Sequence, residues 1–409
     1  MKGVEIHRAP WVFVGMGPPV ADGAVVVSHD RILESGRAQD MRKKFGNASV
    51  RLWDHEEAAL VPGAVNAHTH LDFSLLSLSR PSQPMGFPQW LVSVFQAKEN
   101  LSPSKRRDAH KTGSLQAFQS GTRCFANVMN PPVESFPEPS KIPHEHRFVE
   151  LLGFHCQNLH ELFSPEAITH KPYTFLAAHS LYATSWKVIA QAKAWSRSRG
   201  LLFSIHAAEH SDEVHFVRDG TGFCRDLLQS LGRWDASWRP SGTSPVKTLQ
   251  TLGVLDAQTL LVHMVHVNEE DWNVVARCGA AVCFCPRSNA WIEGTIPRIE
   301  AALQRGIRCA LGTDSLASNE DLNLFREATA VLDGMPGITP ATVLRMVTSI
   351  GAQALGLHPF FGHLGPGAKT PFLAVSVSGS FSTENDLAER IIRHAAQGSM
   401  VWVADTTSH

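Results

Sequence analysis

The strongest constraint on the fold is a repeated alternation of short apolar runs with amphipathic runs. Eight segments have the length and composition of buried strands: residues 60–67, 122–128, 148–153, 173–178, 201–205, 259–262, 279–283 and 307–311. Runs with helical periodicity lie between them, for example residues 106–119, 185–198 and 268–277. Strands that alternate with helices in this way predict an α/β chain folded as a (β/α)₈ TIM-like barrel.

The segments on either side of this repeat have a different pattern. Short apolar runs separated by turn residues occupy residues 6–14, 23–27, 49–53, 372–377 and 400–403. Because so few strands from one terminus would not form a stable sheet, we expect both termini to build one domain. The prediction is a small β-sandwich domain of residues 1–58 and 356–409 beside a barrel of residues 59–355.

Residues 211–255 are longer than one strand–helix unit requires. They combine helical runs with a segment rich in Gly, Pro and Trp. We expect an insertion that forms a lid or a side wall over the barrel.

Composition limits the partners and the compartment. The 409 residues carry a net charge of −1, so there is no electrostatic reason to expect binding to nucleic acid or to a membrane surface. Seven scattered cysteines without a Cys-x-x-Cys pair favour a reducing, cytoplasmic compartment. We therefore expect a cytoplasmic protein whose partner is a small molecule, and we leave its oligomeric state open, a homodimer included.

Metal-binding and titratable residues stand where the predicted strands end, which is where barrel enzymes carry their sites. They are His68 and His70 after the first strand, His179 after the fourth, His206 after the fifth, His263 after the sixth and Asp314 after the eighth. Alternate residues of an extended segment point to the same side, so His68 and His70 predict half of a metal site. Two unrelated surface histidines are the alternative interpretation of that pair.

The chemistry of these residues separates ligands from catalytic groups. A catalytic zinc site combines neutral imidazoles with a carboxylate and keeps one position open for water. Four strand-end residues supply such a set: His68, His70, His206 and Asp314. Glu209 follows His206 by three residues, so it reaches the same cavity without being a ligand and is predicted to act as general acid and base. His263 is predicted to hydrogen-bond the attacking oxygen, and Asp314 to accept the proton of the water.

Two further residues are candidates for binding the substrate. Trp90 follows the first strand and could stack on an aromatic ring, or it could be an apolar lid contact without a ligand. Arg287 follows the seventh strand and could pair with a carboxylate or phosphate of the substrate, or it could form a surface salt bridge. No lysine stands at a strand end in this set to bridge a second ion, so we expect one divalent cation.

Five motifs together resemble the amidohydrolase superfamily, and within it the mononuclear aminohydrolase branch. They are Asn66-Ala-His68-Thr-His70, His206-Ala-Ala-Glu209, His263-Met-Val-His266, Cys285-Pro-Arg-Ser-Asn289 and Leu311-Gly-Thr-Asp314-Ser-Leu-Ala-Ser-Asn319. The resemblance implies that the four ligands bind zinc, with iron as the alternative. It also implies the proton and oxyanion roles of Glu209 and His263, and a contact between His179 and the substrate.

The branch includes guanine, S-adenosylhomocysteine/methylthioadenosine and aminofutalosine deaminases and s-triazine chlorohydrolases. The resemblance therefore implies a hydrolase acting on carbon–nitrogen bonds other than peptide bonds. We expect hydrolytic deamination of an aminopurine-type ring with release of ammonia, with 6-aminodeoxyfutalosine as the first candidate and S-adenosylhomocysteine or methylthioadenosine next. The alternatives are a guanine or cytosine deaminase, a triazine-type chlorohydrolase, or a catalytically silent binding barrel.

Overall fold

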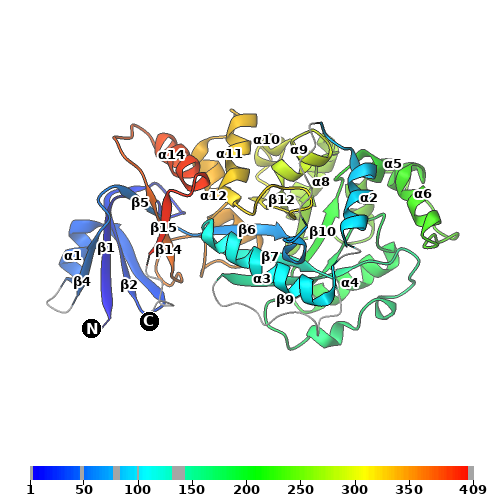
Figure 1. Cartoon of the computed structure of the whole chain (residues 1–409), viewed down its shortest axis with the longest axis horizontal. Helices are drawn as coiled ribbons and strands as arrows, with labels where there is room; N and C mark the ends of the chain where they lie inside the picture. Colours follow the sequence, from blue (N-terminus) through cyan, green and yellow to red (C-terminus); the bar gives the residue numbers. More distant parts are fainter. Residues whose placement is uncertain (1–2, 47–49, 77–82, 99–100, 131–142, 404–409) are drawn as a thin grey trace.

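The computed structural model describes residues 3–46, 50–76, 83–98, 101–130 and 143–403. A large body of strands surrounded by helices lies beside a smaller sheet at one end of the molecule (Figure 1). The predicted α/β barrel with a small β-domain built from both termini is confirmed.

Eight parallel strands form the barrel, and each pairs with its neighbour in the sequence. They are β6 (Ala64–Thr69), β7 (Thr122–Met129), β8 (His144–Leu151), β9 (Thr174–Ala178), β10 (Phe203–Ala207), β11 (Thr259–His263), β12 (Ala281–Phe284) and β13 (Cys309–Leu311). A parallel bridge between Thr69 and Asp314 brings the first strand against the end of the last. Gly312 makes this approach possible, because a Cβ there would lie 2.8 Å from both the His68 carbonyl oxygen and Cys283 Sγ.

Most of the helices cover the outside of the barrel, and one of them, α2 (Phe87–Lys98), lies at its mouth (Figure 1). They are η1 (Leu71–Phe73), α2 (Phe87–Lys98), α3 (Pro103–Gln119), η3 (Leu159–Glu161), η4 (Pro165–Ile168), α4 (Trp186–Ser198), α8 (Glu269–Cys278), α9 (Pro286–Ile292), α10 (Ile299–Leu303), α11 (Leu324–Gly334), α12 (Pro340–Met346) and α13 (Ser349–Ala354). Successive strand residues pack on opposite sides: Leu260 and Val262 belong to a cluster inside the barrel, and Leu261 belongs to the layer under the helices.

The segment predicted as an insertion contains α5 (Ser211–Asp219), α6 (Phe223–Ser230) and α7 (Pro245–Thr251). Trp234 and Trp238, in the loop between α6 and α7, pack against Phe154 and Phe216. These aromatic contacts hold the loop beside the barrel. Leu227 and Leu231 of this segment line the pocket at the barrel mouth.

The terminal strands form one seven-stranded sheet in the order β15-β14-β5-β1-β2-β3, with β4 paired to β1. Their bounds are β1 (Val4–Val12), β2 (Val20–Ser28), β3 (Arg31–Arg37), β4 (Arg51–Asp54), β5 (Ala58–Val61), β14 (Phe372–Ser376) and β15 (Met400–Val403). The single strand predicted over residues 60–67 is in fact two strands, β5 and β6, separated by Pro62 and Gly63. Strand β5 belongs to the terminal sheet but extends past residue 58, where the small domain was predicted to end. The division of the chain into two domains stays a prediction.

Two helices of the terminal segments were not predicted from the sequence: α1 (Ala38–Phe45) and α14 (Glu384–Ala396). Helix α14 begins with a capping box, in which Thr383 and Asp386 bond each other's backbone N–H groups. It packs against α11 and α12, so the C-terminal segment covers part of the barrel as well as contributing to the small sheet (Figure 1).

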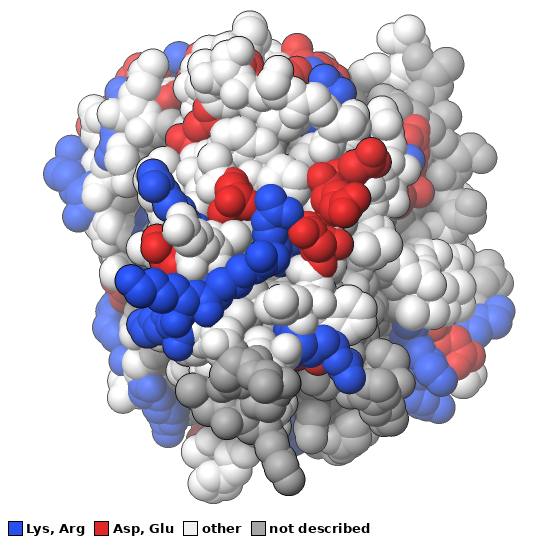
Figure 2. All heavy atoms as spheres, turned by 90° about the vertical axis from the view of Figure 1, so that its left-hand side faces the viewer, with Lys and Arg blue, Asp and Glu red and all other residues white. Residues whose placement is uncertain are grey.

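Basic and acidic side chains lie next to each other on the end of the molecule formed by the terminal sheet (Figure 2). Arg8 pairs with Asp22 and Asp54, and Lys44 pairs with Glu34. Among the residues that the structure describes, no helix has both the length and the apolar character needed to cross a lipid bilayer.

Candidate metal centre

His68 and His70 leave the first barrel strand toward the barrel mouth. The register between β6 and β7 shifts between Asn66 and Thr69, where β6 has one residue more than its partner. A bulge of this kind redirects side chains. The two imidazoles lie with ring centroids 4.8 Å apart, as the His-x-His spacing predicts.

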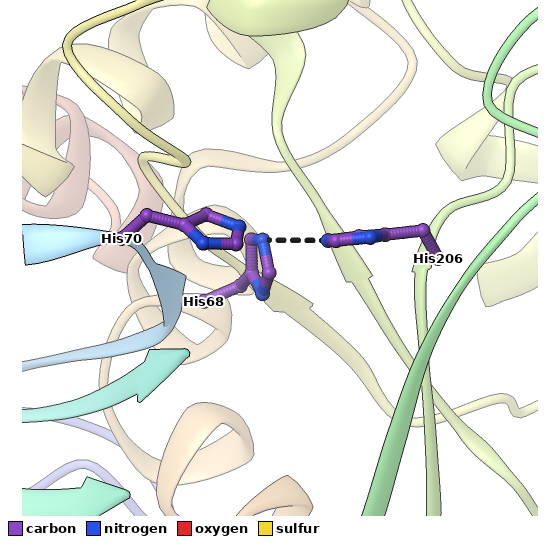
Figure 3. A group of neighbouring side chains, drawn as sticks. All are labelled: His68, His70 and His206. Atoms are coloured by element: carbon purple, nitrogen blue, oxygen red, sulfur yellow. Dashed lines mark hydrogen bonds between the residues drawn. The ribbon is translucent and has the colours of Figure 1, made fainter. Parts of the chain in front are cut away.

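His206 and Asp314 bring the other two donors to the same place. Figure 3 shows the rings of His68, His70 and His206 turned toward one another. Nε2 of His206 lies 3.1 Å from Nε2 of His68, and Oδ1 of Asp314 lies 3.6 Å from Nε2 of both His68 and His70. The four predicted ligands therefore converge, although they are up to 246 residues apart in the chain.

The spacing of these donors fits one divalent cation. Donors that share one zinc ion at about 2.0–2.2 Å lie no more than about 4.3 Å apart, and the separations of His206 from His68 and of Asp314 from His68 and His70 are within that limit. The two Nε2 atoms of His68 and His206 face each other at a distance that either a shared proton or a shared cation can bridge. The donor set of three histidines and one carboxylate is one that catalytic zinc sites use.

The protonation states of the donors also suit a cation. Burial, followed by the charge on His68, lowers the pKa of His70 to about 4, and burial lowers the pKa of His206 well below its ordinary value. For Asp314 burial would raise the pKa, but the hydrogen bond to His68 and the neighbouring histidines hold it well below the usual range. At pH 7 the imidazoles of His70 and His206 are therefore neutral and the Asp314 carboxylate is ionised, as ligands of a cation must be.

Hydroxyl groups hold the carboxylate of Asp314 in place. Ser288 and Ser318 each donate a hydrogen bond of 2.7 Å to Oδ2 of Asp314. The Asp314 backbone lies at φ +56°, in the left-handed region, and its N–H donates to the His68 carbonyl oxygen. Because both hydroxyls bond Oδ2, Oδ1 remains directed at the histidines.

Glu209 follows β10 and lies beside the candidate ligands without bonding to them. Its Oε1 is 3.5 Å from Nε2 of His263. Burial, then the charges of Asp314 and Glu213, raise the pKa of Glu209 well above its ordinary value. A carboxyl group that holds its proton at neutral pH inside a pocket can both donate and accept a proton during a reaction.

His263 reaches the site through a distorted backbone. In the β10–β11 register His206 pairs with Val262, so an undistorted β11 would turn His263 away from His206 and toward the helices. His263 lies instead at φ +75°, and its ring centroid is 5.1 Å from that of His206. The left-handed backbone therefore places this side chain in the barrel mouth, at an energetic cost that functional sites commonly carry.

A pocket at the barrel mouth contains these groups. Its wall includes His70, His179, His206, Glu209, His263 and Asp314. Of the predicted substrate contacts, His179 and Trp90 both lie on this wall, and the Trp90 indole N–H donates to the Ala317 carbonyl oxygen. An apolar face of α2, with Trp90, Leu91 and Val94, forms one side of the pocket.

Arg287 does not lie on the pocket wall among the described residues. Its guanidinium bonds both carboxylate oxygens of Asp321, at 3.0 and 3.2 Å, and Nη2 of Arg287 is 3.3 Å from Glu320. The predicted contact with the substrate is therefore not where the structure places this side chain. Acidic residues from the next loop neutralise the guanidinium in a largely buried salt bridge, and a role of Arg287 in substrate binding stays a prediction.

Three charged residues on the described pocket wall were missed from the sequence: Lys98, Glu150 and Arg233. Glu150, at the end of β8, is fully enclosed, and its Oε2 accepts a hydrogen bond of 2.7 Å from Asn130. Lys98, the last residue of α2, lies with Nζ 4.1 Å from the centroid of Phe73. An acidic residue at the end of a predicted strand could have indicated Glu150, but nothing in the sequence separates Lys98 from other helix-end lysines.

Comparison with known proteins agrees with this geometry. The family model described as "Amidohydrolase family" matches residues 59–390. The chain is 29% identical over 397 residues to an aminodeoxyfutalosine deaminase of Deinococcus radiodurans, which covers 88% of this chain and 85% of that protein. It is 26% identical over 411 residues to a 5-methylthioadenosine/S-adenosylhomocysteine deaminase of Moorella thermoacetica, covering 94% of this chain and 88% of that protein.

Two solved structures share the fold. Helicobacter pylori aminofutalosine deaminase in complex with methylthio-coformycin superposes with a TM-score of 0.81 at 22% identity, covering 97% of this chain and all of that one. An adenosine deaminase from Xanthomonas campestris with bound zinc superposes with a TM-score of 0.78 at 22% identity, covering 98% and 91%.

Proposed function

Because this chain belongs to the amidohydrolase family, we propose that it hydrolytically deaminates an aminopurine nucleoside. The relatives named above act, by their names, on aminodeoxyfutalosine and on methylthioadenosine or S-adenosylhomocysteine. We propose substrates of this class, with 6-aminodeoxyfutalosine first. The observation that carries the proposal is the enclosed Glu209 carboxyl group, which contacts His263 and lines the same pocket as His70, His206 and Asp314.

In the proposed reaction a water molecule adds to the carbon that bears the amino group, and the carbon–nitrogen bond then breaks. A divalent cation held by His68, His70, His206 and Asp314 would supply Lewis-acid activation of that water. Glu209 gives its proton to the neighbouring ring nitrogen, passes one proton of the added water to the departing amino group, and regains the other water proton when the ring carbonyl forms. Ammonia and a ring carbonyl are the products.

His263 stabilises the oxygen that adds to the ring. Asn289 Nδ2 lies 3.2 Å from His263 Nδ1, and because an amide nitrogen can only donate, Nδ1 accepts. The proton of the neutral imidazole is then on Nε2, the nitrogen that faces Glu209 and the pocket. This N–H is a donor for negative charge on the attacking oxygen.

We propose zinc as the resident metal and the cytoplasm as the compartment. Three imidazoles with one carboxylate suit zinc, and the Xanthomonas relative contains it by its title. All seven cysteines are free thiols, which is usual in a reducing compartment.

The direct test is ammonia release from a substrate panel by the zinc-loaded protein. The panel contains 6-aminodeoxyfutalosine, S-adenosylhomocysteine, methylthioadenosine, adenosine and guanine, with cytosine and a chlorotriazine as members outside the class. We expect turnover of at least one 6-aminopurine nucleoside. Turnover of only the pyrimidine or the triazine would contradict the proposed substrate class.

A further inference from the structure

A second cavity lies at the end of the barrel opposite the candidate metal centre. Its volume is about 600 Å³, within the roughly 300–1,000 Å³ of small-molecule sites. His144 and His146, at the start of β8, form one wall. Phe360 and Lys369, from the segment between α13 and β14, form another. The residues of the metal centre do not contribute to its described wall.

The cavity is positively charged. Three basic side chains line it, and its described wall contains no Asp or Glu: the three are Arg31, Arg308 and Lys369. Arg308 is half-buried and donates to the carbonyl oxygens of Ala257, Gly279 and Gln353, and burial lowers its pKa. Holding a partly buried cation against carbonyl groups alone is costly, and an anion in the cavity would compensate it.

Lys369 is the cation best placed to meet a ligand. Its Nζ lies 5.7 Å from the centroid of Phe361, and it takes part in none of the ion pairs found in the described part of the chain. Arg31 is more engaged, because Nη1 donates to the Gly367 carbonyl oxygen and Nε lies 3.9 Å from Asp30. The Asp30 side chain is 63% exposed, so this contact is weak.

Aromatic rings border the same cavity. Tyr173 and Phe360 both line it and are 49% and 47% exposed, which is unusual for large apolar side chains. Tyr173 lies at φ +56°, a conformation that bulky residues rarely adopt, and its ring stacks on His146 with centroids 5.6 Å apart. Exposed rings beside cations form a surface suited to a flat, negatively charged ligand.

The two histidines of the wall add neutral polar groups. Burial, then the charges of Arg123 and Lys369, lower the pKa of His144 to about 4, and burial lowers the pKa of His146 to about 3. Among the described residues Nε2 of His144 and Nδ1 of His146 have no hydrogen-bond partner. These two nitrogens are buried, so the histidines contribute a neutral wall to the cavity and add no charge to it.

We propose that this cavity binds a planar organic anion, that is, a flat ring carrying a phosphate or a carboxylate. Lys369 and Arg31 pair with the anionic group, and Tyr173 and Phe360 contact the ring. The site is separate from the proposed deamination site and does not depend on it.

Calorimetry on the full-length, metal-loaded protein tests this proposal. The probes are adenosine 5′-monophosphate, benzoate and inorganic phosphate. At least one of the two ring-containing anions is expected to bind more tightly than phosphate. Tighter binding of adenosine 5′-monophosphate than of benzoate would identify a nucleotide as the ligand, and the reverse order would identify an aromatic carboxylate. Equal or tighter binding of phosphate would contradict the role of the ring.

Variants locate the binding. Lys369→Ala should weaken the binding of the ring-containing anion by about tenfold or more, which is the usual effect of losing one charge-assisted contact. Lys171→Ala is the matched control, because it removes the same charge from an exposed residue that does not line the cavity and should have no effect. Tyr173→Ala should weaken the binding of the ring-containing anions but leave the binding of phosphate unchanged.

A crystal soaked with adenosine 5′-monophosphate completes the test, because a nucleotide could also enter the barrel mouth. Density beside Tyr173 and Lys369 is the expected result. Absence of binding by all three probes, equal effects of Lys369→Ala and Lys171→Ala, or density only at the barrel mouth would each overturn the proposal.

Discussion

The amide nitrogen of Asn289 lies 3.2 Å from Nδ1 of His263 and donates a hydrogen bond to it. The two residues are on different elements, α9 and β11, so the contact depends on the closed barrel. It fixes which nitrogen of His263 carries the proton, and it directs that N–H at the position where the reacting oxygen would lie.

Asn289→Ala is therefore expected to reduce kcat by up to about 100-fold with little change in KM, because the donor for the developing charge loses its orientation. Steady-state kinetics on the best substrate of the panel measures this. Asn273→Ala, on the exposed surface of α8, is the control and should behave as the wild type. Normal kcat in Asn289→Ala would mean that the tautomer of His263 is not important.

Glu209→Gln is expected to lower kcat by about 10²–10⁴-fold, because glutamine cannot transfer a proton. The variant should keep its metal, because residue 209 is not one of the predicted metal ligands. Turnover and metal content are measured on the same preparation. Glu166→Gln, at an exposed position, is the control. A variant that kept near-normal turnover would exclude the proposed proton transfer by Glu209.

Ser288→Ala and Ser318→Ala each remove one hydrogen bond to Oδ2 of Asp314. Each change is expected to weaken metal binding by about 10–100-fold, which is usual when the partner of a ligand is lost. Competition with a chelator of known affinity measures the effect. Because both hydroxyls bond the same oxygen, the double variant should show non-additive losses. An unchanged metal affinity in the double variant would mean that the two hydroxyl groups do not position the Asp314 carboxylate for metal binding.

Glu213 is expected to make stability fall as the pH rises. Burial raises the pKa of Glu213 from 4.5 to about 8, so between those values the folded protein keeps a proton that the unfolded chain releases. One such group lowers the free energy of unfolding by at most about 1.4 kcal/mol per pH unit. Its stabilising effect is complete below pH 4.5 and is lost as the pH approaches 8.

Urea unfolding of the wild type and of Glu213→Gln at pH 5, 6, 7 and 8 checks this prediction. The variant should lose less stability than the wild type across the range. An equal pH dependence in both proteins would mean that Glu213 is not protonated in the fold. Glu300→Gln, on the surface of α10, is the matched control.

The sequence predicted the ligand set because barrel geometry is periodic. Once eight strands are placed, the residue that ends each strand is known, and parallel strands bring those ends together. His68, His70, His206 and Asp314 were selected in this way. The structure places the three histidines in one group of neighbouring donors and Asp314 in a second group with His68 and His263, and their binding of one metal ion stays a prediction. His263 was found by the same rule, although the left-handed backbone that turns it into the pocket is not visible in the sequence.

Other features depend on contacts between distant segments. Arg287 was weighed as a substrate contact because it stands near a strand end, but its direction is set by Asp321, 34 residues away. Lys98 joins the pocket only because α2 packs over the barrel mouth. Helix α14 has a local sequence signal, the capping box of Thr383 and Asp386, but apolar periodicity alone does not reveal it.

We propose that four distant side chains, those of His68, His70, His206 and Asp314, hold one metal ion. Anomalous diffraction from a zinc-loaded crystal tests it most directly. We predict a single anomalous peak about 2 Å from Nε2 of His68, His70 and His206 and from Oδ1 of Asp314. No peak at the barrel mouth, or a peak bound by fewer than three of these atoms, would contradict the account.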